Sequence, residues 1–276
     1  MLSSDDVNSF RSAGWLIVQR FYDPGRDFTP VFQEINQLLA YIGADSTVNG
    51  IDAGSIGQSI AEKLLVLQQK DRKALGAVYR SLRHLLSLQH LLLDERLQRI
   101  YRQLVPDVGL INLCPYTGTR IDIKGEEEYL FGWHQDYHFI QMSDDSVVFW
   151  FPFVELDSEG AVEILEGSHL DGIRRARILD PGNQNKNGAR TLSIDSDVVV
   201  ERYASVKPRV GVGDLLIFST LLVHRSVPQH ERRIRVTSQF RLGNFANSRA
   251  IERGWPVGQL EGRLFHEDHS DLVDGD

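Results

Sequence analysis

The stretch Gly132-Trp133-His134-Gln135-Asp136-Tyr137 sets an imidazole and a carboxylate two positions apart. Residues with this spacing point to the same face of a β-strand, so His134 and Asp136 can reach one ion. A second histidine, His224, closes the apolar run that begins at Asp214. Two imidazoles and one carboxylate suit a divalent first-row metal and leave coordination positions open, as in non-haem Fe(II) oxygenases. The pattern therefore predicts a catalytic metal centre with His134, Asp136 and His224 as its ligands.

The composition is that of an ordinary globular protein, with 276 residues of which 42% are hydrophobic and 25% charged. A formal net charge of −8 argues against a nucleic acid or an anionic membrane as a partner. No apolar run approaches the roughly 20 residues that span a bilayer, and the N-terminus lacks the basic and apolar regions of a signal peptide. The single cysteine, Cys114, excludes an internal disulfide and lies in an apolar run typical of a buried strand. These features favour a cytoplasmic protein and leave its oligomeric state open.

Residues 1–107 carry the patterns of helices. A start with capping serines followed by Gly14 predicts a helix near 5–12, and Thr29-Pro30 predicts a cap with proline at the first helical position. Apolar residues then recur at helical spacing until Gly43, and the same spacing continues through 59–70 and 73–104. We therefore expect this region to be mainly helical support. These helices contain His84 and His90, which we do not assign to the metal.

From residue 108 to about 245, short apolar runs separated by Gly, Pro, Asp and Asn predict a β-rich core. The runs expected to form strands are 110–113, 129–133, 147–153, 161–165, 198–203, 215–218 and 234–242. Short strands with turns between them favour a jelly roll, or double-stranded β-helix, and helices before strands give an α+β fold with the helices packed against that core. We expect one domain over 1–276, with a polar insertion at 171–197 and a solvated C-terminal segment, 246–276.

Several motifs together resemble the phytanoyl-CoA dioxygenase family of Fe(II)/2-oxoglutarate-dependent dioxygenases. The motifs are His134-x-Asp136, the distal His224 followed by Arg235, the segment 160–169 (GAVEILEGSH), and Gly213-Asp214 before the strand that leads to His224. The resemblance covers residues 108–243 well and residues 1–20 weakly. It implies a jelly-roll enzyme with Fe(II) as cofactor and with 2-oxoglutarate and O2 as cosubstrates.

The resemblance also implies a cosubstrate site. Arg235 would bind the far carboxylate of 2-oxoglutarate through its planar, two-pronged guanidinium. Ser226 would be the hydroxyl partner of the same carboxylate, and Trp150 would line the pocket. By two-residue alternation, Arg233 and Arg241 share the strand face of Arg235, and Arg233 is the alternative if the register differs by two.

The insertion at 171–197 follows directly after His169, which the resemblance places at the mouth of the metal pocket. The insertion is long and polar, so we expect it to act as a mobile lid with substrate contacts. Its arginines suggest a substrate that carries a carboxylate or phosphate, and a solvated basic turn is the alternative; they are Arg174, Arg175 and Arg177. Three further residues lie close to the metal ligands in sequence and receive no role: Gln135, Tyr137 and His138.

The activity that the resemblance implies is hydroxylation of a small-molecule substrate, coupled to decarboxylation of 2-oxoglutarate to succinate and CO2. Desaturation and epoxidation stay open, and the sequence does not identify the substrate. Asp136 argues against halogenation, because the related halogenases have a small residue at this position. Two other classes stay open: a non-catalytic metal-binding jelly-roll protein, and a cupin-like metalloenzyme that does not use 2-oxoglutarate. Mere metal binding needs neither Arg235 nor Ser226, and cupins usually supply more histidines per site and no such arginine.

Overall fold

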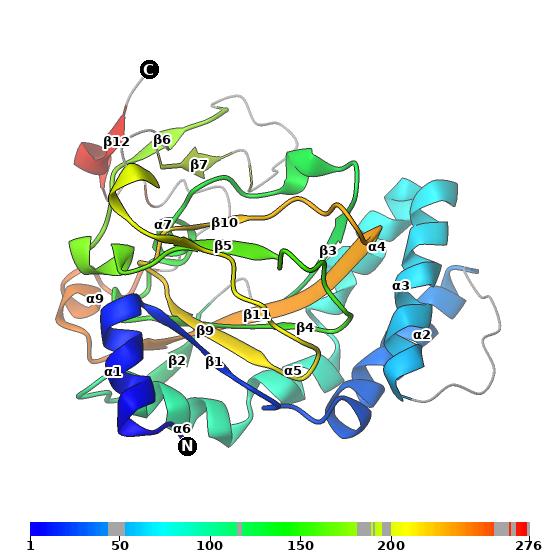
Figure 1. The fold of residues 1–276 in the computed structure, drawn as a ribbon, viewed down its shortest axis with the longest axis horizontal. Coiled ribbons are helices and arrows are strands. Elements are labelled where there is room, and N and C mark those ends of the chain that lie inside the picture. Colours follow the sequence, from blue (N-terminus) through cyan, green and yellow to red (C-terminus); the bar gives the residue numbers. More distant parts are fainter. Residues whose placement is uncertain are drawn as a thin grey trace.

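Two antiparallel β-sheets face each other in the computed structural model, which describes residues 1–43, 53–114, 118–180, 189, 191–194, 200–256, 265 and 269–274 (Figure 1). The larger sheet has the strand order β1-β9-β4-β11-β2, and β3 also pairs with β11. Its strands are β1 (Trp15–Val18), β2 (Ile111–Leu113), β3 (Gly118–Ile123), β4 (Val147–Pro152), β9 (Leu215–Ser219) and β11 (Ile234–Asn244). The facing sheet has the order β10-β5-β8, formed by β5 (Val162–Leu165), β8 (Ser205–Val206) and β10 (His224–Ser226). A third, small sheet joins β6 (Ala176–Ile178), β7 (Leu192–Ser193) and β12 (Val273–Asp274).

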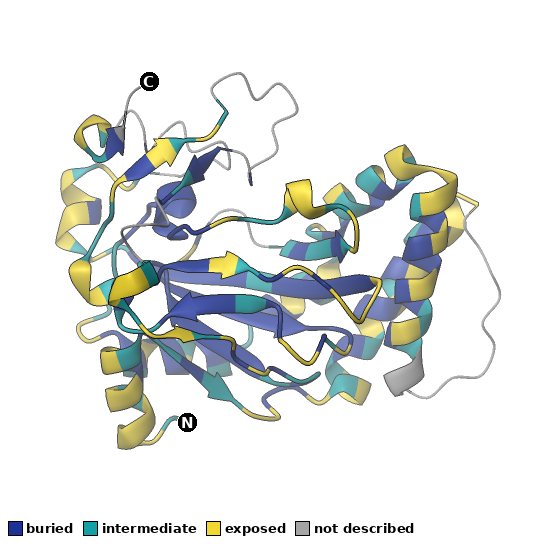
Figure 2. Cartoon of the chain, turned by 45° about the horizontal axis from the view of Figure 1, so that its top comes forward, coloured by how far each residue is buried: buried dark blue, intermediate teal, exposed yellow. Residues whose placement is uncertain are grey.

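Strand β4 lies in the middle of the larger sheet and is buried on both faces. Because side chains alternate along a strand, Val147, Phe149 and Phe151 point to one face and pack with the helices. Val148 and Trp150 point to the other face, where they pack with residues of β5 and β9. The sheet therefore separates a helix-covered core from an inner space between the two sheets. Figure 2 shows the buried strands of both sheets between the exposed outer sides of the helices.

The helices before the core pack their apolar faces on the outer side of the larger sheet. They are α1 (Ser4–Ala13), α2 (Thr29–Tyr41), α3 (Ala53–Lys70), α4 (Arg72–Leu82), α5 (Leu86–Leu92) and α6 (Glu95–Leu104). Short later helices are η2 (Glu127–Tyr129), α7 (Tyr137–Ile140), η3 (Ser168–Asp171), η5 (Val200–Arg202), α9 (Ser248–Glu252) and η6 (Ser270–Leu272). The α+β class, with a double-stranded β-helix core and supporting helices, is confirmed.

Local capping explains where the first helix begins and ends. The hydroxyl of Ser3 accepts from the backbone N–H of Asp6, whose carboxylate accepts from the backbone N–H of Ser3. Gly14 closes the helix in the left-handed region, with φ of 84°. The expected helix and its stop are confirmed. The expected cap at Thr29 is wrong, because a π-helix, η1 (Pro24–Phe28), precedes it and its hydroxyl instead donates to the carbonyl of Gly25.

Three expected elements differ from the structure. The region 73–104 is broken into α4, α5 and α6: Asp94 caps the start of α6 with its carboxylate, whereas α5 begins after Leu85 without a side-chain cap. The expected strand at 129–133 is absent, since a 3₁₀ turn at Glu127–Tyr129 leads into irregular backbone. Of the expected strand at 198–203, residues 198 and 199 lie outside the described residues, and Val200–Arg202 form a 3₁₀ turn.

The N-terminal region contributes to the sheet as well as to the helical layer, because β1 pairs antiparallel with β9. Trp15 lies opposite Phe218, and Val18 lies opposite Leu215. This pairing ties the start of the chain to the strand that leads to His224. No helix in the described ranges has the length and apolar character needed to cross a membrane. Cys114 follows β2 and is buried, as expected from its surroundings.

Candidate active site

The proposed metal ligands come together where the two sheets meet. His134 and His224 form an isolated antiparallel bridge, in which each backbone N–H donates to the carbonyl of the other at 3.0 Å. Asp136 directly precedes α7 and is not part of a strand. Its Oδ1 lies 3.4 Å from Nε2 of His134 and 3.6 Å from Nε2 of His224. The three predicted ligands therefore lie close together, but the same-strand reason given for His134 and Asp136 is wrong.

Hydrogen bonds to the backbone settle which histidine nitrogens face the site. Nδ1 of His134 lies 2.8 Å from the carbonyl oxygen of Gly132, and Nδ1 of His224 lies 2.9 Å from that of Leu222. A carbonyl oxygen only accepts, so each Nδ1 carries a hydrogen, and Nε2 is the nitrogen that has the lone pair when the ring is neutral. Burial, together with the neighbouring His134, lowers the pKa of His224 to about 3. His224 is therefore neutral near pH 7, in the form that binds metals.

Arg241 holds the carboxylate of Asp136 from the side away from the histidines. Its Nε and Nη2 donate to Oδ2 of Asp136 at 2.8 and 2.6 Å, and both side chains are buried. Burial alone would raise the pKa of Asp136, but the charge of Arg241 and the neighbouring His134 and His224 together outweigh it and hold that pKa well below its usual range. Oδ2 is thus engaged, and Oδ1 is left for an ion. The sequence pattern placed Arg241 on this strand face but did not reveal its partner.

These three side chains fit a divalent metal. Their ligand atoms all lie within 4.8 Å of one another, and all three residues are buried. Two neutral imidazole nitrogens and one ionised carboxylate oxygen are the donors of a 2-His-1-carboxylate iron site. Across the described ranges, no other group of His, Cys, Asp and Glu comes close enough to share an ion. His84 and His90 are exposed on the helical side, in agreement with their exclusion.

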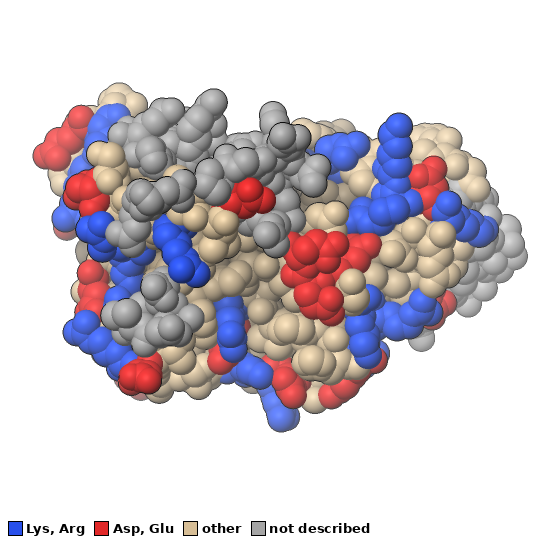
Figure 3. Space-filling model, turned by 90° about the horizontal axis from the view of Figure 1, so that it is seen from above, with Lys and Arg blue, Asp and Glu red and all other residues tan. Residues whose placement is uncertain are grey.

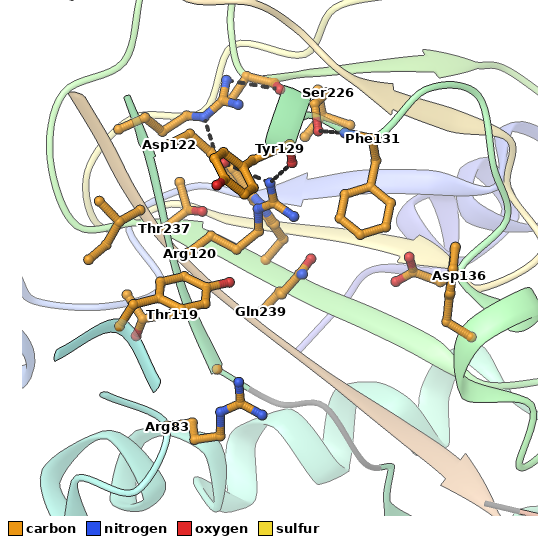
Figure 4. A pocket seen from close by; sticks show the side chains of 18 of the residues that line it. Arg83, Thr119, Arg120, Asp122, Tyr129, Phe131, Asp136, Ser226, Thr237 and Gln239 are labelled. Carbon is orange, nitrogen blue, oxygen red and sulfur yellow. Dashed lines mark hydrogen bonds and ion pairs between the residues drawn. The ribbon is translucent and has the colours of Figure 1, made fainter. Parts of the chain in front are cut away.

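A cavity of about 530 Å³ opens from the three ligands into the space between β3, β10 and β11 (Figure 4). Every second residue of β11 lines it, from Arg235 through Thr237 and Gln239 to Arg241. The remaining walls include Trp150, Phe131, which lies in irregular backbone, and residues of other strands, which are Thr119, Arg120, Asp122, Phe218 and Ser226. At its far end the cavity reaches α4, through Tyr79, Arg80 and Arg83. The volume is sufficient for small organic molecules.

Arg235 lies in this cavity wall and is 4% exposed. Its Nε donates to Oδ2 of Asp122 at 3.0 Å, and its Nη1 donates to the carbonyl oxygens of Val227 at 2.9 Å and Ala161 at 3.3 Å. Oδ1 of Asp122 accepts from Nη2 of Arg120 at 2.6 Å. One carboxylate therefore lies between two guanidinium groups, which the sequence reasoning missed. The sequence feature that could have revealed this cluster is the alternation of charged and apolar residues along 118–123.

The other cosubstrate candidates share the cavity with Arg235. The hydroxyl oxygen of Ser226 accepts from the backbone N–H of Phe131 at 3.2 Å, so its own hydrogen stays available for a second partner. Trp150 is buried and pairs with Gln239 across β4 and β11. Arg233, the register alternative, is exposed and lines a different, smaller cavity. The structure thus brings Arg235, and not Arg233, into the space shared with the metal ligands.

The residues without an assigned role hold the surrounding backbone. The amide of Gln135 donates to the carbonyls of Leu221 at 2.6 Å and Gly172 at 2.8 Å and accepts from the backbone N–H of Arg174 at 2.9 Å. His138 lies 3.0 Å from the carbonyl of Arg174, and the hydroxyl of Tyr137 accepts from Arg253. The start of the insertion is therefore fixed to the ligand-bearing loop.

The expected place of His169 is wrong. Its Nε2 lies 3.2 Å from the carbonyl oxygen of Arg11, and its ring packs against Gly14 at the end of α1. It is not among the residues that line the cavity. The segment that contains it therefore packs on the first helix.

The arginines of the insertion also lie off the cavity. Arg174 pairs with Asp171 and Tyr203, Arg175 donates to the carbonyl of Asp271, and Arg177 is exposed on β6. Residues 181–188, 190 and 195–199 of the insertion lie outside the described residues, so its expected behaviour as a lid stays a prediction. On the face seen in Figure 3, basic and acidic side chains are interspersed.

Comparison with known proteins gives one family match. The model described as "Phytanoyl-CoA dioxygenase (PhyH)" matches residues 10–237. No curated protein matches the chain. A similar solved structure is EvdO2 from Micromonospora carbonacea var. aurantiaca complexed with 2-oxoglutarate, with a TM-score of 0.53 and 14% identity over 90% of this chain and 94% of that one. The epimerase SnoN in complex with Fe3+, alpha ketoglutarate and nogalamycin RO has a TM-score of 0.52 and 12% identity, over 87% of this chain and 82% of that one. EctD from S. alaskensis with bound Fe has a TM-score of 0.51 and 16% identity, over 89% of this chain and 78% of that one. At these identities, the likeness shows a shared fold.

Proposed function

This chain belongs to the phytanoyl-CoA dioxygenase family, and from that premise we propose that it hydroxylates a small organic molecule at an unactivated C–H bond. The chain is an Fe(II)/2-oxoglutarate-dependent oxygenase that uses O2. The observation that carries the proposal is the buried group His134, Asp136 and His224 at the end of a cavity that also contains Arg235. Bound Fe(II), with 2-oxoglutarate and O2, supplies the oxidative chemistry.

The side chains of the site prepare the metal ligands. The carbonyls of Gly132 and Leu222 fix the histidine rings with Nε2 turned to the ion, and Arg241 keeps Asp136 ionised. Hydrogen bonds of this kind orient ligands and make their rearrangement unnecessary on binding. The described part of the chain thus presents Asp136 ionised and His224 neutral, the forms that bind iron.

For the cosubstrate, we assign Arg235 to the far carboxylate of 2-oxoglutarate, with Ser226 as a hydroxyl donor and Trp150 as a wall. Asp122 and two backbone carbonyls hold the guanidinium through Nε and Nη1. Its Nη2 has no recorded partner among the described residues. Fixing the guanidinium in advance reduces the entropy lost when the carboxylate binds.

Two features argue against the other classes of protein. A structural metal site needs neither a cavity of this size nor the buried pair of Asp122 and Arg235 with Arg120 beside it. A cupin-like enzyme that works without 2-oxoglutarate has no use for an arginine at the position of Arg235. Family membership points the same way.

We also propose an anionic substrate, on the evidence of the cavity and not of the insertion. Two aspartates line the cavity, Asp122 and Asp136, against seven arginines: Arg72, Arg80, Arg83, Arg120, Arg225, Arg235 and Arg241. Glu126 and Glu163, which pair with Arg72 and Arg225 from outside the lining, do not balance this excess. Such a surplus attracts and retains an anion.

The fate of molecular oxygen tests the reaction type. The full chain, loaded with Fe(II) and 2-oxoglutarate, is to be incubated under oxygen-18 gas with a panel of small carboxylates and phosphate esters. Hydroxylation predicts succinate formed in step with a product that is heavier by one oxygen-18 atom. A product formed with succinate but without added oxygen would show desaturation, epimerisation or ring closure and would overturn the proposed reaction.

A further inference from the structure

The arginines that line the cavity differ in whether a carboxylate accompanies them. Those with an acidic partner are Arg72 with Glu126, Arg120 and Arg235 with Asp122, Arg225 with Glu163, and Arg241 with Asp136. Arg80 and Arg83 have neither an acid nor another recorded hydrogen-bond acceptor among the described residues. Of these two arginines, Arg80 is exposed and Arg83 is half-buried. The donors of Arg83 are thus available to a ligand.

Arg83 follows the last residue of α4 and lies directly against the first residue of β3. A Cβ atom added to Gly118 would lie 3.2 Å from the Cβ of Arg83, closer than most such contacts, so glycine permits this approach. Figure 4 shows Arg83 reaching from the helix towards Gln239, with Arg120 beyond it and Asp136 on the other side of the cavity. The side chain therefore points into the space that leads to the metal ligands.

The groups around Arg83 suit an anion. Arg120 is fixed by Asp122, by the carbonyl of Tyr129 at 3.1 Å, and by the ring of Phe131, whose centroid lies 5.0 Å from its guanidinium carbon. Gln239 offers amide hydrogens from the floor of the cavity. The hydroxyl of Thr119 is buried and has no recorded partner among the described residues. Polar groups left unpaired in a buried wall are costly unless a ligand or water satisfies them.

We propose that Arg83, together with Arg120 and Gln239, forms an anion-binding subsite that takes a carboxylate or phosphate of the substrate. The subsite is separate from Arg235, which is assigned to 2-oxoglutarate. A substrate bound there carries its anionic group at the α4 end of the cavity and presents an uncharged carbon towards the metal ligands. This inference rests on the proposed function and specifies the substrate class for the same site.

The test uses the full chain loaded with Fe(II) and 2-oxoglutarate without oxygen, so that the metal and Arg235 are already engaged. Inorganic phosphate and acetate are then titrated separately by calorimetry, which distinguishes the two anion chemistries. Wild-type protein should bind one of them at one site per chain. Arg83→Gln should weaken that binding about 10- to 150-fold, the effect of losing a hydrogen bond to a charged group. Arg83→Lys, which keeps the charge, should weaken it less.

Arg99→Gln is the matched control, because Arg99 is an exposed arginine of α6 outside the cavity and its loss changes the net charge equally. It should bind the probe anion like wild type. Equal binding by wild type and Arg83→Gln, or no binding by wild type, would overturn the subsite. Weaker binding of 2-oxoglutarate in Arg83→Gln would reassign Arg83 to the cosubstrate and also overturn it. Failure of wild type to bind Fe(II) and 2-oxoglutarate is a separate result, which would refute the enzyme function itself.

Discussion

Replacing Arg235 with alanine should weaken the binding of 2-oxoglutarate and leave the iron site in place. In the structure, the guanidinium of Arg235 contacts Asp122 and the carbonyls of Ala161 and Val227, and none of these is a metal ligand. Truncation therefore removes the proposed carboxylate anchor without touching the side chains that hold the ion.

Two magnitudes follow from these contacts. Loss of a buried charged contact to a ligand costs about 2–5 kcal/mol, which corresponds to about a 30- to 5,000-fold rise in the dissociation constant of 2-oxoglutarate. Breaking a buried ion pair costs about 3–5 kcal/mol of folding stability, and the lower value applies here because Arg120 still neutralises Asp122.

The assay is an oxygen-free titration of the Fe(II)-loaded protein with 2-oxoglutarate, accompanied by a separate titration of the metal-free protein with Fe(II). Arg233→Ala is the control, because Arg233 is exposed and outside the main cavity. A 2-oxoglutarate affinity of Arg235→Ala within about threefold of wild type would refute the assignment. If Arg233→Ala shows the larger loss, the carboxylate is bound by the other arginine.

Three more outcomes are expected. His134→Ala and His224→Ala should each lose Fe(II) binding and turnover, whereas His90→Ala, which changes an exposed helical histidine, should keep both; normal activity in His224→Ala would remove it from the ligand set. Arg241→Gln should lower the folding stability of the metal-free protein by about 3–5 kcal/mol, because Asp136 loses its buried partner. Fe(II) should raise the melting temperature of the variant more than that of wild type. An unchanged melting temperature of the metal-free variant would contradict the role of Arg241. Burial opposes ionisation of Asp157, but the backbone N–H groups of His230, Glu231 and Arg232 donate to its carboxylate and lower its pKa, so the carboxylate stabilises the fold above the unfolded pKa of about 3.9 and this stabilisation is lost as the pH falls through the lower folded pKa. In chemical denaturation at pH 7, Asp157→Asn should lower the free energy of unfolding by about 2 kcal/mol, and the difference from wild type should vanish in acid. A difference that does not change with pH would exclude this origin.

The sequence predicted the identity of the metal ligands better than their local structure. His134 and Asp136 do converge on one point, but a backbone bridge places His134, and the start of α7 together with Arg241 places Asp136. Such irregular backbone has no periodic pattern from which it could be predicted. His224, by contrast, follows a buried strand with a continuous apolar run, and its approach to the site was predictable.

The same contrast holds for the rest of the fold. Strands β4 and β9 were predictable from their continuous apolar runs, and β11 from the alternation of apolar and polar residues along much of it, whereas β10 covers only His224–Ser226 and has no run to indicate it. The helical spacing of 73–104 is real, but breaks at residues 83–85 and at Asp94 divide it into three helices, and apolar periodicity does not indicate such breaks. The partnership of Arg120, Asp122 and Arg235 depends on the pairing of β3 with β11, which only the tertiary structure provides.

The central claim is that His134, Asp136 and His224 hold one Fe(II) to which 2-oxoglutarate binds. Its most direct test is the visible charge-transfer absorption that appears when Fe(II) and 2-oxoglutarate are both bound, measured without oxygen in wild type and in His224→Ala. We predict an absorption band in wild type that saturates at one Fe(II) per chain and is absent from the variant. A wild-type protein that binds Fe(II) but develops no band with 2-oxoglutarate, or an equal band in His224→Ala, would contradict the account.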